Sequence, residues 1–160
     1  MRELIFGLAL MAAALAAPTA QAGEIVDATD PAAVLEIALS HGAASLKKDA
    51  MGDPLIEGRI EDKGYRLVFY DCDEGRECKS IMFAAVWELE NLTDASMADW
   101  NREQRFGKAF IDEDGRATVE MNVNLNGGVT RANLDDTMDW WKLILVEFPE
   151  YHSGLSWIFR

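Results

Sequence analysis

The chain has 160 residues, which suits one domain and is short for two independently folded ones. It carries 28 Asp and Glu against 15 Lys and Arg, a formal charge of −13 that disfavours nucleic acid and anionic membrane surfaces as partners. Two His and two Cys leave few side chains for a transition-metal centre or for a nucleophile with its base, so no metal or cofactor is expected.

Residues 1–22 have the layout of a secretory signal peptide. Arg2 precedes an apolar run over residues 4–17, and the segment ends in the small-residue site Ala20-Gln21-Ala22. The run is shorter than the roughly 20 residues of a membrane-spanning helix, and a proline follows it. We therefore predict cleavage after this segment, one domain over residues 23–160, and a periplasmic or secreted protein that is not inserted in a membrane after cleavage.

The first half of this domain predicts a helix followed by four strands. Asp30 and Pro31 supply a cap and a first turn for a helix over residues 31–41. Beyond Gly42 the apolar residues alternate with period two, and turns rich in Gly, Asp and Pro separate the runs. The expected strands cover residues 44–48, 55–61, 65–72 and 78–89.

The second half predicts a helix, two strands and a last helix. Thr93 or Asp94 can cap a helix that ends near Gly107. Strands over residues 108–112 and 116–125 flank the turn sequence Asp114-Gly115. Thr130 can cap the last helix, which Pro149 should end. The order helix, four strands, helix, two strands, helix indicates an α+β fold, with helices packed on an antiparallel sheet.

Two cysteines lie at the facing ends of the third and fourth strands. Five residues separate Cys72 from Cys78, a length that suits a bridge across a hairpin. A redox pair would be Cys-x-x-Cys at the start of a helix, where the dipole lowers the pKa of a thiol. We therefore predict a structural disulfide, formed in an oxidising compartment.

Other chemistry-bearing residues carry weaker signals. Acidic turns at residues 71–75 and 112–115 place carboxylates two apart, but Gly comes too early in each for the calcium loop. His41 precedes Gly42 at the end of a helix, where capping or solvent exposure is expected, and His152 lies in the C-terminal tail. No sequence signature of a nucleophile elbow, a zinc protease or a phosphate loop occurs, so we expect no catalytic residues and no enzyme.

The tryptophans separate into core and surface candidates. Trp100 and Trp141 fall on predicted apolar faces, the second one on a face shared by Leu134, Thr137, Met138, Ile144, Leu145 and Phe148. Trp140 is turned by about 100° from Trp141 and should be partly exposed. It joins three carboxylates in a candidate interaction surface: Asp135, Asp136, Asp139 and Trp140. Alternatively, Trp140 packs beneath the apolar tail at residues 155–159 and the carboxylates only aid solubility.

Three segments resemble the YbjN family. They are Met97–Phe110 with its Trp100-Asn101 pair, Asp112–Arg116, and Asn126-Gly127-Gly128-Val129-Thr130. The likeness spans roughly residues 30–150. It implies a regulator of sensory transduction, a fold similar to that of type III secretion chaperones, and a small acidic protein able to form a homodimer. The resemblance brings no set of catalytic residues.

Two functions are compatible with these features. The first is an exported, non-enzymatic module that binds or regulates another protein, or acts on it like a chaperone, through a basic or amphipathic segment of that partner. The second is a small-ligand or cation-binding protein, or an unrecognised acid/base hydrolase, that uses clustered carboxylates. The residues available for that second function are Asp112, Asp114, Asp135, Asp136 and Asp139.

Overall fold

The computed structural model describes residues 23–153, so the predicted signal peptide and the tail at residues 155–159 lie outside the described residues. The elements in chain order are β1 (Ile25–Val26), α1 (Pro31–His41), β2 (Ala43–Lys48), β3 (Pro54–Ile60), β4 (Lys63–Tyr70), β5 (Ser80–Trp87), α2 (Asp94–Glu103), β6 (Lys108–Ile111), β7 (Ala117–Asn124), β8 (Val129–Thr130) and α3 (Arg131–Ser153). This arrangement confirms the predicted α+β class and the order of the main elements.

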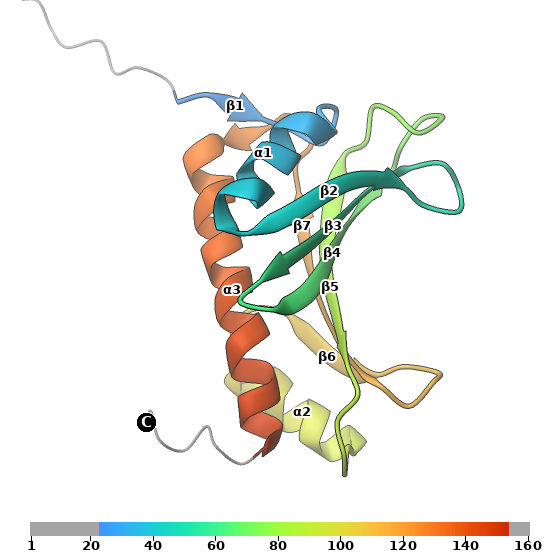
Figure 1. Cartoon of the computed structure of the whole chain (residues 1–160), viewed down its shortest axis with the longest axis vertical. Coiled ribbons are helices and arrows are strands. Elements are labelled where there is room, and N and C mark those ends of the chain that lie inside the picture. Colours follow the sequence, from blue (N-terminus) through green and yellow to red (C-terminus); the bar gives the residue numbers. More distant parts are fainter. Residues whose placement is uncertain (1–22, 154–160) are drawn as a thin grey trace, which may run out of the picture.

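One antiparallel sheet of six strands forms the body of the molecule, in the order β2-β3-β4-β5-β7-β6. The helices lie on one side of it, with α1 and α3 along the sheet and α2 near β6 (Figure 1). Alternate strand residues such as Leu67, Phe69, Ile81 and Phe83 are buried, as expected for a sheet with one covered face. The opposite face carries most of the charged strand residues.

The core contains the two tryptophans predicted to be buried. Trp100 and Trp141 are fully buried. The Trp141 ring lies 5.3 Å from that of Phe83 on β5, and the Trp100 ring meets Phe148 of α3 edge-on at 5.0 Å. These contacts hold α3 and α2 together against the sheet, and they confirm the predicted buried face of the last helix.

The helix caps are also those expected from the sequence. The Asp30 carboxylate accepts hydrogen bonds from two backbone N–H groups in the first turn of α1, and Thr93 and Ser96 form a reciprocal capping box on α2. The sequence did not indicate the small sheet in which β1 pairs with β8. Strands of two residues are too short to produce a detectable periodicity.

The second helix ends earlier than predicted. It stops at Glu103 rather than near Gly107 because Asn101 ties the helix to the next strand. The Asn101 side chain accepts from the Ala109 backbone N–H at 2.7 Å and donates to the Ala109 carbonyl oxygen at 2.9 Å. The chain between them must therefore turn back over a few residues, which places Phe106 outside the helix.

The last helix runs past the residue expected to end it. Pro149 lies inside α3, which continues to Ser153, so His152 belongs to the final helical turn and not to a tail. A proline removes one backbone hydrogen bond, but packing beyond it compensates for the loss. The Tyr151 ring meets Trp100 at 5.4 Å, and the His152 ring meets Phe148 at 4.7 Å.

Among residues 23–153 no helix is both long and apolar enough to cross a membrane.

The predicted cysteine pairing appears at the end of the β4–β5 hairpin. The sulfur atoms of Cys72 and Cys78 lie 2.12 Å apart, at disulfide distance. Inside the loop they close, Asp73 and Arg76 exchange two backbone hydrogen bonds. The bridge therefore fixes the closed end of the hairpin.

Candidate functional site

The exposed side of α3 carries the surface predicted from the sequence. We call it the α3 stripe and define it by five residues of which the first four were predicted: Asp135, Asp136, Asp139, Trp140 and Leu143. The aspartates are exposed, and Trp140 is half-buried as expected. Leu143 is 57% exposed and was missed. Its spacing, three residues after Trp140 and four after Asp139, could have identified it.

The Trp140 ring is held in one orientation. Its Nε1 donates a hydrogen bond to the Asp136 carboxylate at 3.1 Å, one helical turn away. The ring meets Phe106 at a centroid distance of 3.9 Å with the planes at 89°, and the Arg105 guanidinium lies 5.9 Å from the Trp140 ring centroid. An aromatic side chain fixed before binding loses little entropy when a partner covers it.

Two carboxylates of the stripe have a partner on another helix. The Nε2 atom of His41 lies 2.8 Å from Asp135 Oδ1, and its Nδ1 atom lies 3.5 Å from Asp139 Oδ1. Capping or solvent exposure was expected for His41, but its side chain is 11% exposed and contacts α3 instead. The sequence could not indicate this contact, because Asp135 lies 94 residues away from His41. This contact ties the end of α1 to α3 beside the stripe.

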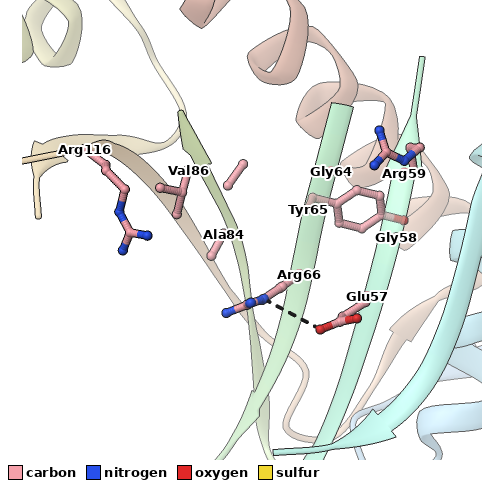
Figure 2. A pocket seen from close by; sticks show the side chains of 10 residues that line it. Glu57, Gly58, Arg59, Gly64, Tyr65, Arg66, Ala84, Val86 and Arg116 are labelled. Carbon is pink, nitrogen blue, oxygen red and sulfur yellow. Dashed lines mark ion pairs between the residues drawn. The ribbon is translucent and has the colours of Figure 1, made fainter. Parts of the chain in front are cut away.

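A second feature, which the sequence did not indicate, is a cleft where the sheet divides. Strands β4 and β5 pair only from Tyr70–Ser80 to Arg66–Ala84. Beyond this point β4 continues beside β3, and β5 continues beside β7. Figure 2 shows the two strands diverging there. The opening between them is what we call the β4–β5 cleft, and it has a volume of about 470 Å³.

The walls of the β4–β5 cleft combine small residues with basic side chains. The lining residues are Glu57, Gly58, Arg59, Gly64, Tyr65, Arg66, Ala84, Ala85, Val86 and Arg116. Three arginines and one glutamate thus line the cleft in a protein of charge −13, and of the arginines only Arg66 is directed at Glu57 (Figure 2). Glu57 is bonded mainly to Lys47, whose ammonium group lies 2.5 Å away and lowers the pKa of Glu57, whereas Arg66 Nε is 4.0 Å away.

Tyr65 lies on the inner side of the cleft. Its ring covers Gly58 on the adjacent strand, where a Cβ atom would lie 2.2 Å from the Tyr65 Cζ atom. The hydroxyl is buried without a hydrogen-bond partner among the described residues. Burial raises the pKa of Tyr65 to about 12. Tyr65 therefore forms part of the packed core behind the cleft.

The remaining acidic candidates are occupied by a neighbouring arginine. Arg116 donates to Asp112 at 2.9 Å and lies 2.8 Å from Asp114 across the β6–β7 turn. The Arg116 backbone N–H also donates to Asp112 at 2.8 Å, and together these bonds lower the pKa of Asp112. In residues 23–153 the His, Cys, Asp and Glu side chains form no group of three that could hold a metal ion. Asp112 and Asp114 therefore form part of the β6–β7 turn and pair with Arg116.

Comparison with known proteins gives one family. Residues 30–150 match the model of YbjN, described as "putative bacterial sensory transduction regulator". No curated protein matches the chain. The matched residues extend from the cap of α1 to the last turns of α3 and so include both the α3 stripe and the β4–β5 cleft. The chain therefore belongs to the YbjN family.

Proposed function

We propose that this protein is an exported, non-enzymatic regulatory module that binds a basic, amphipathic segment of another protein through the α3 stripe. The observation that carries the proposal is Trp140, fixed by Asp136 and Phe106 and lying beside the exposed Leu143. Trp140 and Leu143 can contact the apolar side of such a segment, and the neighbouring carboxylates of Asp135, Asp136 and Asp139 can pair with its basic side.

The charges of the stripe and of the partner have separate effects. The carboxylates attract a cationic segment and speed its encounter, while Trp140 and Leu143 supply apolar contact that salt does not screen. The affinity should therefore fall with ionic strength but not vanish. A regulator that works by contact alone fits the description of the family. Holding an amphipathic segment of a partner would also be a chaperone-like activity.

Export rests on the signal-like residues 1–22 and on the cysteine pair, since disulfides persist in oxidising compartments. We expect the intact mass of the exported protein to correspond to a chain that begins at Gly23 and contains one disulfide. Retention of Met1 in a membrane-bound product would contradict the proposed export. The homodimer that the family resemblance implies is checked on the same sample by light scattering, which measures the mass of the protein in solution.

The binding proposal is tested with a synthetic amphipathic helix of Leu and Lys, titrated into the purified protein at low and at high salt. Leu143→Ala should weaken binding several-fold with an unchanged melting temperature, because Leu143 is exposed. The matched control is Leu39→Ala, an exposed leucine on α1, which should bind normally. Equal binding by all three proteins, or binding abolished by salt alone, would contradict the proposal.

A thermal-shift screen with calcium, zinc and metabolites tests the alternative of a small-ligand protein. A ligand that binds only the native state raises its melting temperature. The acidic candidates Asp112 and Asp114 already bind Arg116, which does not favour this alternative.

A further inference from the structure

The β4–β5 cleft leaves backbone edges of two strands without a neighbour. Residues 63–65 of β4 pair with β3 alone, and residues 85–87 of β5 pair with β7 alone. Each strand therefore has one side on which the ladder is not continued, and unpaired strand edges are sites where another extended chain can add. The cleft is a break within the sheet, flanked by two such edges.

The exposed residues of these edges are Gly64 on β4 and Val86 on β5, whereas Tyr65 and Ala85 are buried. Nothing lies within 4 Å of the position that a Cβ atom would take on Gly64. On the opposite wall, Ala84 and Ala85 are the smallest side chains apart from glycine, and Val86 is 47% exposed. An extended segment can thus pass over the face of β4 at Gly64 without displacing a side chain.

The charge of the cleft indicates which segment it would accept. Arg59 pairs with no carboxylate in residues 23–153, and its Nη1 atom donates instead to the Asp62 carbonyl oxygen at 2.5 Å. Arg66 is 66% exposed, and its closest carboxylate is 4.0 Å away on a glutamate already bonded to Lys47. Arg66 lies opposite Ala84, where the open edge begins, and Arg59 lies opposite Gly64 on β3, one strand behind that edge and on the same face as Gly64. They are free to pair with carboxylates of a ligand.

We propose that the β4–β5 cleft binds a short, extended, acidic segment of a partner protein. The main chain of the segment adds to the open edge of β4 at Gly64, and its carboxylates pair with Arg59 and Arg66. A small anion would bind the arginines but could not pair with the strand edge. Pairing of an extended backbone therefore distinguishes an acidic segment from a small anion. This second site has the opposite charge preference to the α3 stripe and does not depend on the function proposed there.

The test uses a fluorescein-labelled peptide of alternating Glu and Val, titrated into the purified protein with its disulfide intact. Arg59→Gln and Arg66→Gln should each weaken binding by about fivefold, the effect of one exposed ion pair of about 1 kcal/mol. Gly64→Val should weaken binding several-fold, because its side chain would stand on the face of β4 beside Arg59 and Arg66, and it should retain the fold since that face has room for it. Circular dichroism verifies that fold.

Three controls make the outcome decisive. Lys108→Gln removes an exposed cation of β6 that does not line the cleft, and Leu143→Ala alters only the α3 stripe, so both should bind the peptide normally. A peptide with Gln in place of Glu should bind about tenfold or more weakly, since both ion pairs are lost. Equal binding of the Gln peptide, unchanged affinity in both arginine variants, or displacement by free glutamate or phosphate at the same concentration as the peptide would overturn the proposal.

Discussion

The α3 stripe and the β4–β5 cleft differ in charge and in the part of the chain that forms them. The stripe is acidic and consists of side chains from residues 135–143 of one helix. The cleft is basic and is bounded by backbone edges of two strands that stop pairing at Arg66–Ala84. The cleft is therefore a locally basic region on a protein of charge −13. Because the two regions share no residue, substitutions in one should leave the other unaffected.

The largest expected effect separates the stripe from the core beneath it. Trp141→Ala should lower the free energy of unfolding by roughly 3–5 kcal/mol, because it empties a fully buried site against Phe83. Trp140→Ala should cost about 1–2 kcal/mol, since this ring is half-buried and loses chiefly its contact with Phe106. Denaturant unfolding of both variants measures the difference. A larger loss for Trp140 would mean that the stripe is part of the core.

The features of α3 could be predicted from the sequence because they depend on local spacing. The buried position of Trp141 and the partial exposure of Trp140 follow from the helical period alone. Features that depend on distant residues could not be predicted. His41 contacts Asp135 across 94 residues, and α3 passes Pro149 because Tyr151 packs on Trp100.

The β4–β5 cleft could not be predicted from the sequence, because it too depends on residues that are distant along the chain. Residues 81–87 of β5 are apolar throughout, both where β5 pairs with β4 and where the two strands separate. The point of separation depends on how each strand follows its other neighbour, which is a property of the whole sheet. The strands and their hairpin were therefore predicted, while the opening between them and its three arginines were not.

Two glycines on the cleft should respond in opposite ways. Gly58→Ala should destabilise the protein by about 1–3 kcal/mol, because the new Cβ would lie 2.2 Å from the ring of the buried Tyr65. Gly64→Ala should leave stability unchanged or raise it by roughly 0.5 kcal/mol, since no atom lies within 4 Å. Thermal unfolding measures both. A similar loss of stability in both variants would show that the face of β4 at Gly64 is packed against other atoms.

A pH titration tests the burial of Tyr65 behind the cleft. Its pKa is raised to about 12 in the folded protein, against an ordinary value of 10.0, so the unfolded chain loses the proton first as the pH rises. The contribution of Tyr65 to the free energy of unfolding should therefore be constant below pH 10 and fall between pH 10 and pH 12. Tyr65→Phe should remove part of this fall and cost little at neutral pH, because the hydroxyl has no partner among residues 23–153. An identical alkaline profile for the variant would contradict the buried hydroxyl.

The smallest expected effect comes from an ion pair that joins the two regions. Lys142 on α3 donates to Glu61, in the turn between β3 and β4, at 2.8 Å, and this bond lowers the pKa of Glu61. Because the folded pKa lies below the ordinary value of 4.5, the contribution is present above that pH and is lost as the pH falls through the folded pKa. Lys142→Gln should therefore lower the melting temperature slightly at pH 7 and not at all at pH 2. Since both side chains are largely exposed, the pair should also leave the binding of the acidic peptide and of the basic helix unchanged. If Lys142→Gln altered either affinity, the ion pair would couple the α3 stripe to the β4–β5 cleft, and the two regions would act as one site.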